Sequence, residues 1–176
     1  MRLGLPAHGT FLDLGCGQGL LLALLREARP DLSLHGIDAH ARRVDLARRA
    51  LGADAVVEQR DLRELEFPQG CAAVALIDVL LYLPEPDPVL RAAAQALAPG
   101  GVLLVREPDA GAGLAFAFTR LSSWFDALAR GTSGARRNYR SAAQWRAQLE
   151  GLGFSVESEP MSRRTPFANV LFLCKK

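Results

Sequence analysis

The sequence predicts an α/β fold, in which a doubly wound, mostly parallel sheet ends in a strand that runs the opposite way. Three observations lead to this prediction. Short apolar segments alternate along the chain with segments of helical character. Each apolar segment is almost free of polar residues, which is typical of parallel strands that helices cover on both faces. The last two apolar segments are joined by a short connection.

The apolar segments give the expected strands, which are residues 10–14, 32–38, 55–59, the apolar beginning of 72–81, 102–105, 154–159 and 169–174. The helices expected between them occupy residues 20–28, 41–51, 88–98 and 141–152. Residues that start or stop helices stand at the ends of these segments, namely Pro30, Gly52, Asp87, Pro88, Ser141 and Gly153. We expect Asp87 and Ser141 to be N-caps, Pro88 to be a first helical residue, and Gly52 and Gly153 to be C-caps.

The two C-terminal strands are expected to be antiparallel. About nine residues, 160–168, connect them. A parallel crossover connection needs a dozen residues or more. The C-terminal pair therefore predicts a reversed edge on an otherwise parallel sheet.

Length and composition indicate a single domain over residues 1–176. The chain has 49% hydrophobic and 23% charged residues, as ordinary globular domains do. Segment 108–140 places glycines around apolar stretches, and we expect it to be an insertion or a lid after the fifth strand.

Charge and cysteine content narrow the function classes. The net charge of +2 is not that of a dedicated nucleic-acid-binding protein. No apolar stretch is long enough to predict a membrane span, and the N-terminal residues lack the apolar core of a secretory signal. The three cysteines match no metal or disulfide spacing. We therefore expect a cytoplasmic protein without a metal site, a nucleic-acid partner or a membrane span.

The strongest chemical signal is the segment FLDLGCGQG, residues 11–19. Its glycines stand between a strand and the N-terminus of a helix, where unpaired N–H groups and the helix dipole favour a ligand. Dinucleotide-binding turns space their glycines as G-x-G-x-x-G, whereas the spacing here is G-x-G-x-G. Asp13, two residues before the first glycine, would repel a pyrophosphate and attract an ammonium group. The turn therefore favours a zwitterionic or cationic ligand.

The pattern D-L-G-C-G-x-G resembles the S-adenosylmethionine-dependent methyltransferases of the Rossmann-like class, small bacterial type. Further landmarks follow in the family's order, namely Asp38, QRDL (59–62), LIDVLLYLP (76–84) and LAPGGVLLV (97–105). The resemblance extends over residues 10–173. It implies the fold described above, S-adenosylmethionine as cofactor, S-adenosylhomocysteine as product and a small-molecule methyl acceptor.

The resemblance also implies which residues hold the methionine part of the cofactor. Asp13 would lie near its amine, and Gly15, Cys16 and Gly17 would line it. Asp78, at the end of the fourth strand, would lie under the sulfonium and face the acceptor.

The nucleoside part of the cofactor is assigned to two other acidic residues. Asp38, followed by Ala39, would bind both ribose hydroxyls, because two carboxylate oxygens can accept two protons. Asp61 would accept from the adenine amino group, and Leu62 would offer its backbone N–H to the ring. Asp38, Asp61 and Asp78 are also suitable helix N-caps. Their shared position at carboxyl ends of strands, where ligands bind in open α/β sheets, favours the binding role.

Residues after the fourth and fifth strands are candidates for the acceptor side. Tyr82 and Glu107 are the candidate catalytic residues, and Glu107 is alternatively part of a solvated loop together with Asp109. The candidate acceptor-binding residues are Tyr82, Arg106, Tyr139 and Arg140. Four aromatic residues would either wall an apolar acceptor or form the buried face of a lid helix, namely Phe116, Phe118, Trp124 and Phe125. Arginine and aromatic residues in this segment favour a small aromatic or acyl-type metabolite over a macromolecule.

Transfer of the methyl group is an in-line displacement, so positioning of the reacting atoms contributes much of the rate. A base is needed only for an acceptor that is protonated.

Two alternative functions remain. An NAD(P)-dependent oxidoreductase is opposed by the glycine spacing and by the lack of an evident Tyr/Lys or His pair. A non-catalytic nucleotide-binding protein of the same fold is supported by the short segment before the first strand and opposed by the complete set of acidic residues. Because this segment is short, we expect a cofactor site that is more open, that is covered by the partner subunit of a homodimer, or that is completed by residues upstream of a misplaced start codon.

Overall fold

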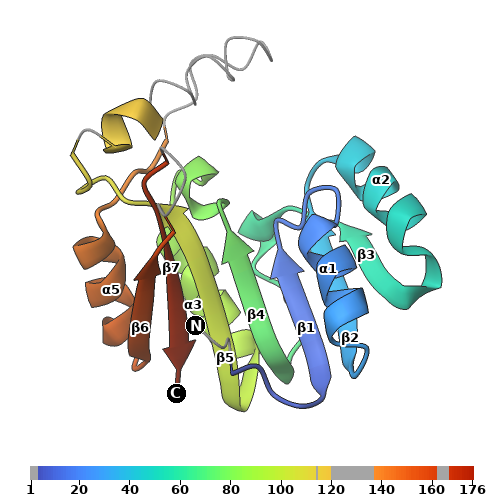
Figure 1. The fold of residues 1–176 in the computed structure, drawn as a ribbon. Coiled ribbons are helices and arrows are strands. Elements are labelled where there is room, and N and C mark those ends of the chain that lie inside the picture. Colours follow the sequence, from blue (N-terminus) through green and yellow to red (C-terminus); the bar gives the residue numbers. More distant parts are fainter. Residues whose placement is uncertain (1–3, 114, 120–136, 162–166) are drawn as a thin grey trace.

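The computed structural model of the chain describes residues 4–113, 115–119, 137–161 and 167–176 (Figure 1). Its centre is a seven-stranded sheet with the order β3-β2-β1-β4-β5-β7-β6. The strands are β1 (Gly9–Leu14), β2 (Leu32–Asp38), β3 (Ala55–Gln59), β4 (Cys71–Ile77), β5 (Leu97–Pro108), β6 (Ser155–Pro160) and β7 (Asn169–Lys175). Strands β1 to β5 are parallel, and β7 is antiparallel to both β5 and β6. The predicted α/β class and the reversed last strand are confirmed.

The reversed strand β7 lies inside the sheet, between β5 and β6. This placement refines the expected reversed edge, because β6 is the outermost strand. The physical reason lies in the side chains. Val170, Phe172 and Leu173 of β7 are buried, so β7 needs a neighbour on each side and cover on each face, whereas most residues of β6 are exposed.

Helices cover both faces of the sheet (Figure 1). Helices α1 (Leu20–Ala28) and α2 (Ala41–Leu51) lie on one face, and α3 (Pro86–Ala96) and α5 (Ala142–Gly151) lie on the other. Each face has its own apolar core. Phe11 and Leu22 belong to the first core, and Trp145 and Phe172 belong to the second. None of the described helices is long and apolar enough to cross a membrane.

Two predicted boundaries of α3 are wrong. The helix begins at Pro86 with Glu85 as N-cap, so Asp87 and Pro88 lie in its first turn. A proline fits the first helical position because it has no N–H group to satisfy. The helix ends at Ala96, before the predicted Ala98. Ala98 precedes Pro99, and a residue before proline avoids helical backbone angles. The strand β5 therefore begins at Leu97.

The structure has the predicted caps of the other helices, except that the C-cap of α5 lies one residue before the predicted one. Ser141 caps α5, and its hydroxyl accepts from the Gln144 N–H while the Gln144 side chain accepts from the Ser141 N–H. The C-cap of α5 is Leu152, and Gly153 follows it at a φ of 86°. Gly52 is the C-cap of α2. Three short 3-10 turns connect other elements, namely η1 (Gly52–Asp54), η2 (Leu62–Glu64) and η3 (Leu80–Tyr82).

The segment predicted as an insertion or lid, 108–140, is described in part. Residues 115–119 are helical. The chain then returns beside η3, where the Asn138 N–H donates to the Leu81 carbonyl at 2.8 Å. Trp124 and Phe125 lie outside the described residues.

Candidate active site

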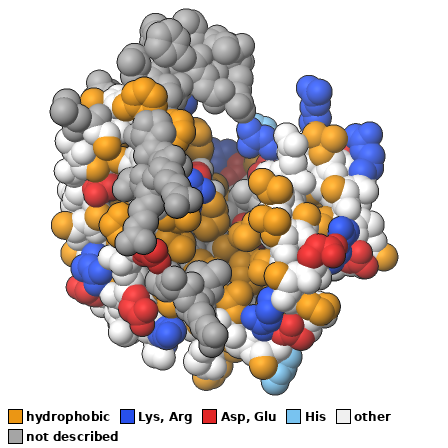
Figure 2. Space-filling view, in the orientation of Figure 1, with side chains coloured by type: hydrophobic (Ala, Val, Ile, Leu, Met, Phe, Trp, Pro, Cys, Tyr) orange, Lys and Arg blue, Asp and Glu red, His pale blue; other side chains and the backbone are white. Residues whose placement is uncertain are grey.

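The carboxyl ends of β1, β2 and β4 meet at one edge of the sheet, which is where ligands bind in open α/β sheets. Figure 2 shows the molecule hollowed there, between the half built on β4 and β5 and the half that carries α1 and α2. Two groups of ionisable side chains lie at this edge. One group comes from β1 and β2, and the other comes from β4 and β5.

The glycine turn after β1 is held by the end of β2. The N–H groups of Gly15 and Cys16 both donate to the Ile37 carbonyl, at 2.7 and 3.0 Å. Gly15 has a φ of 81°, and a Cβ there would lie 2.6 Å from the Val79 side chain, so only glycine fits. Gly17 has a φ of 57°, and a Cβ there would meet no atom within 4 Å. The turn is therefore rigid at Gly15 and borders open space at Gly17.

Asp38 connects this turn to the end of β2. Its carboxylate accepts from the Gly17 N–H at 2.9 Å and from the His40 N–H at 2.8 Å, and only 5% of the residue is exposed. Each carboxylate oxygen can accept a further hydrogen bond. Asp38 therefore orients the glycine turn and retains acceptor capacity for a pair of hydroxyl groups. Ala39, the next residue, is exposed beside it.

Asp13 is buried beneath the turn. Among the described residues its carboxyl group has no hydrogen-bond partner, although only 3% of the residue is exposed. Burial, and secondly the charge of Asp38, raise the pKa of Asp13 to about 7. A cationic group of a ligand would offset both effects, because it supplies the missing donor and the opposite charge. The Asp13 carboxyl group can accept from, and therefore fits, the ammonium group of an amino-acid-like ligand.

The acidic residue expected at the adenine end lies in a different environment. Asp61 caps η2, where its carboxylate accepts from the Arg63 N–H and pairs with the Arg63 guanidinium. These contacts lower the pKa of Asp61 to about 2. Arg63 is largely exposed, so a ligand can displace its side chain at little cost. The Leu62 side chain is buried in the core, which leaves only its backbone to face a ligand. The roles of both residues stay predictions.

The second group of ionisable side chains joins β4 to β5. Asp78 follows β4 at a φ of 54°, and its Oδ2 pairs with Arg106 Nη1 at 3.1 Å. Its Oδ1 and the Arg106 Nε are enclosed and have no hydrogen-bond partner in the described part of the chain. Burial raises the pKa of Asp78, and the Arg106 charge opposes this increase in part. Arg106 is thus paired with a protein carboxylate, and its predicted role in binding the acceptor stays a prediction.

Glu107 is fully buried in β5, so the expectation of a solvated loop is wrong. Its Oε1 accepts from the Val79 and Leu80 N–H groups at 3.0 and 2.7 Å. Burial raises its pKa to about 8, although these backbone hydrogen bonds oppose the increase. Glu107 therefore orients the turn between β4 and η3. This geometry does not support its predicted role as a catalytic base, because no part of it is exposed to a ligand.

Arg140 and Asp109, which follow the fourth and fifth strands in the sequence, both make structural contacts. Arg140 pairs with Asp87 of α3, bonds Gln148 of α5 and lies over the Trp145 ring at 4.8 Å. These contacts use the Arg140 guanidinium within the protein, and its predicted role in binding the acceptor stays a prediction. Asp109 accepts from the N–H groups of Gly111 and Ala142, which places it at the start of α5.

Tyr139 lies within an aromatic group of the same segment. Its ring packs edge-on against Phe116, with centroids 5.1 Å apart, and its hydroxyl accepts from Arg137 at 3.3 Å. Phe118 packs against Phe167, with centroids 5.9 Å apart. Phe118 is nevertheless 47% exposed, so both predicted roles of these aromatic residues, acceptor wall and buried helix face, stay predictions.

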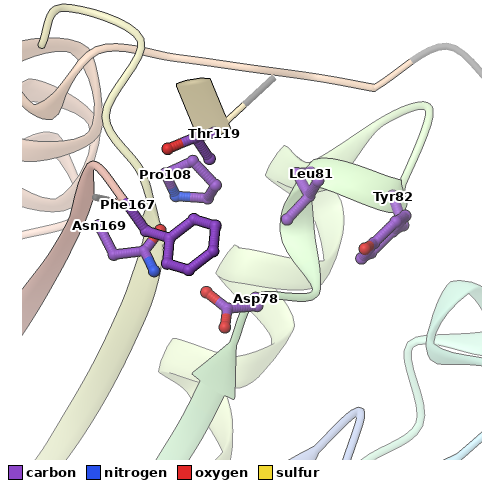
Figure 3. Close-up of a pocket in the computed structure, with 7 residues that line it drawn as sticks. All are labelled: Asp78, Leu81, Tyr82, Pro108, Thr119, Phe167 and Asn169. Carbon is purple, nitrogen blue, oxygen red and sulfur yellow. The ribbon is translucent and has the colours of Figure 1, made fainter. Parts of the chain in front are cut away.

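A pocket of about 160 Å³ lies beside Asp78 (Figure 3). Seven described residues line it, namely Asp78, Leu81, Tyr82, Pro108, Thr119, Phe167 and Asn169. Figure 3 shows the Asp78 carboxyl group turned toward the Phe167 ring and the Asn169 amide, with Tyr82 on the other side. Tyr82 is 57% exposed, and the Arg137 guanidinium lies over its ring at 5.3 Å.

Sequence reasoning missed Phe167, Asn169 and Thr119 as lining residues. Asn169 reaches the pocket because it pairs with Pro108 at the end of β5. No local signal gives that register, since it depends on the insertion of β7 between β5 and β6. In the described part of the chain, no group of three or more His, Cys, Asp or Glu side chains is placed to hold a metal ion.

Comparison with known proteins gives a family match. A family model described as a methyltransferase domain matches residues 1–159. A trans-aconitate 2-methyltransferase from Sinorhizobium fredii is 40% identical over 106 residues, which cover 60% of this chain and 40% of that protein. The curated relatives of this name are matched over less than half of their own length.

Solved structures show the same fold. A chain in the complex between the Haloferax volcanii Trm112 methyltransferase activator and a putative methyltransferase superposes with a TM-score of 0.81. Its sequence identity is 18%, over 99% of this chain and 85% of that one. A magnesium protoporphyrin IX methyltransferase from Synechocystis, solved with bound S-adenosylhomocysteine, gives a TM-score of 0.73. Its identity is 21%, over 98% of this chain and 76% of that one.

Proposed function

This chain belongs to the methyltransferase domain family, and from that premise we propose that it transfers a methyl group from S-adenosylmethionine to a small-molecule acceptor. The relative named for trans-aconitate supports a small-molecule acceptor. The fold neighbour solved with S-adenosylhomocysteine supports the cofactor. The acceptor itself is the subject of the next subsection.

The observation that carries this proposal is the open glycine turn between two buried carboxyl groups. Gly17 borders open space, Asp13 lies beneath the turn without a hydrogen-bond partner in the described residues, and Asp38 holds the turn from β2. An ammonium group would satisfy Asp13, and ribose hydroxyls would donate to Asp38. The residues present therefore fit the methionine and ribose parts of the cofactor.

The bound cofactor would supply a methyl group that is already activated by a positively charged sulfur. The protein residues then have the task of positioning. The glycine turn and Asp38 fix one end of the site, while Glu107 holds the turn that carries η3 and Tyr82. Holding the reacting atoms in line can contribute several kcal/mol to the rate.

Isothermal titration calorimetry with S-adenosylhomocysteine, S-adenosylmethionine and NADH tests the proposal. We expect micromolar binding of the first two and none of NADH. Asp38→Ala should weaken S-adenosylhomocysteine binding by about 1–3 kcal/mol, through the loss of charge-assisted hydrogen bonds. The matched control is Asp31→Ala, which removes a surface carboxylate paired with Arg29 and should leave binding unchanged.

Binding of NADH alone would refute the proposal in favour of an oxidoreductase. Binding of S-adenosylhomocysteine with equal affinity by the Asp38→Ala variant, with its thermal unfolding unchanged, would refute the assignment of Asp38. Binding without turnover of any acceptor would favour a non-catalytic protein of the same fold.

A further inference from the structure

The backbone at Asn169, where β7 begins, is held by three hydrogen bonds. The Ala168 N–H donates to the Thr119 hydroxyl at 2.9 Å, and the Ala168 carbonyl accepts from the Asp109 N–H at 2.7 Å. The Asn169 carbonyl accepts from the Met161 N–H at 2.8 Å. These bonds fix the position of Asn169 without using its side chain.

The Asn169 side-chain amide is available to a ligand. It makes no hydrogen bond within the described part of the chain, and its polar atoms are not among those enclosed there. It lines the pocket beside Asp78, and Figure 3 shows it next to the Phe167 ring, on the side that faces Asp78. A rigid backbone that carries an accessible amide is an arrangement by which proteins orient ligands.

The other polar groups on that side of the pocket are already used or enclosed. The Thr119 hydroxyl accepts one hydrogen bond and donates another within the protein. Asp78 Oδ2 pairs with Arg106, and Asp78 Oδ1 is enclosed. The Tyr82 side chain lies on the opposite side of the pocket, as Figure 3 shows. Among the described residues of the lining, Asn169 is therefore the polar residue best placed to select a ligand.

The charges at the pocket disfavour an anionic ligand. Of the described residues that line it, Asp78 is acidic and none is basic. Arg106 is paired with Asp78, and the Arg137 guanidinium lies over the Tyr82 ring and donates to the Tyr139 hydroxyl. A ligand carboxylate would meet the negative charge of Asp78 without a cation in the lining to balance it. A neutral ligand meets no such repulsion.

The size of the pocket and the Asn169 amide together define a ligand class. A cavity of about 150 Å³ can hold one six-membered ring, and the volume here is about 160 Å³. An amide has a carbonyl group that accepts and an NH2 group that donates. One ligand group satisfies both when it presents a donor and an acceptor side by side, as a lactam or a carboxamide does. A ketone would satisfy the NH2 group alone.

We propose that Asn169 selects and orients the methyl acceptor, and that this acceptor is a small neutral molecule with a hydrogen-bond donor and an acceptor side by side. This inference rests on the proposed function, because it concerns the acceptor of the same reaction. It adds to the site a residue that binds the acceptor and takes no part in the transfer of the methyl group.

Three small compounds of similar size test the inference on the full chain, namely δ-valerolactam, cyclohexanone and cyclopentanecarboxylate. The first offers a donor beside an acceptor, the second an acceptor alone, and the third a negative charge. Ligand-observed NMR measures their binding to the protein alone and to the protein saturated with S-adenosylhomocysteine. We expect the lactam to bind about tenfold more tightly than the ketone, which is the effect of one further hydrogen bond. The carboxylate should not bind.

Variants at Asn169 separate recognition from a structural role. Asn169→Ala should reduce the ratio of the two affinities from about ten to about one, because the lactam loses its additional partner. Asn169→Leu, which fills a similar volume without hydrogen bonds, should do the same and provides the test if the alanine variant fails to fold. A structural role would weaken the binding of lactam and ketone equally and leave the ratio unchanged. Gln95→Ala, the matched control, removes an exposed amide of α3 and should leave the ratio unchanged.

Four results would overturn the inference. They are no binding of the lactam, equal affinities for lactam and ketone, a preference for the lactam that persists in both Asn169 variants, and binding of the carboxylate in place of the lactam. The last result would favour Arg106 as the residue that binds the acceptor.

Failure of this inference is distinguishable from failure of the proposed function. If S-adenosylhomocysteine binds and the lactam does not, the inference alone is refuted. If the lactam binds through Asn169 but S-adenosylhomocysteine does not, the proposed function is refuted, and with it the role of Asn169 in methyl transfer.

Discussion

Replacing Asp13 with asparagine should stabilise the ligand-free protein at alkaline pH, and should do so much less at acidic pH. Asparagine has the shape of aspartate but carries no charge and does not titrate. The replacement therefore removes the cost of a buried carboxylate that has no hydrogen-bond partner in the described residues. The same replacement should abolish the attraction for a ligand ammonium group, so stability and binding should change in opposite directions.

The magnitude follows from the pKa of Asp13, which burial and the Asp38 charge raise from 3.8 to about 7. Between these values the unfolded chain has lost the proton that the folded chain keeps, so increasing pH opposes folding until the folded group ionises near pH 7. At about 1.4 kcal/mol per pKa unit, the cost is about 2 kcal/mol at about pH 5 and about 4 kcal/mol at about pH 8. The stabilisation by Asp13→Asn should therefore grow by roughly 2–3 kcal/mol between these two pH values.

Urea denaturation of both proteins at the two pH values measures this change. The asparagine amide itself leaves polar atoms unsatisfied, at a cost of about 1–3 kcal/mol, but this cost is the same at both pH values and cancels in the difference. Asp31→Asn is the control, because Asp31 is exposed and its pKa is lowered by Arg29. A stabilisation that is independent of pH, or one that decreases with pH, would refute the reasoning.

Three further predictions follow from the contacts at the site. Gly15→Ala should destabilise the fold strongly, because its Cβ would lie 2.6 Å from Val79. Gly17→Ala should lower the free energy of unfolding by only about 1 kcal/mol, because of its positive φ, and should mainly weaken S-adenosylhomocysteine binding. Thermal unfolding measures the first effect and calorimetry the second. Arg140→Ala should lower the free energy of unfolding by about 1–2 kcal/mol and leave cofactor affinity unchanged, and an increase in acceptor KM alone would contradict this structural role. Glu107→Gln should keep the fold and remove the Glu107 part of the loss of stability between about pH 5 and pH 8, since the pKa of Glu107 is raised from 4.5 to about 8. A pH profile identical to that of the unchanged protein would disprove this.

Much of the fold was predictable because its signals are local. Apolar runs bounded by glycine and proline predicted the strands β1 to β4 to within about a residue. The spacing of apolar residues predicted the helices α1 and α2 with the bounds that the structure has. The prediction failed at α3, where three prolines in close succession left the starting position open. The sequence allows several starting positions for α3, and the packing of the helix selects Pro86.

The sequence predicted the proposed cofactor half of the site better than the proposed acceptor half. Gly15, Gly17 and Asp38 lie in turns that directly follow β1 and β2, so their positions were fixed once these strands were known. Arg140 and Glu107 depend instead on partners far along the chain. Arg140 pairs with a residue of α3, and Glu107 bonds the turn after β4.

The sequence by itself determined the parallel sheet, the glycine turn and the row of acidic residues at the strand ends, because each depends on residues close together in the chain. Only the tertiary structure decided which of the charged groups face a ligand. In the structure Glu107 is buried, Arg140 pairs with Asp87, and Asn169 lines the pocket beside Asp78. The physical reason is that burial and pairing depend on the order of strands in the sheet, above all on the insertion of β7 between β5 and β6.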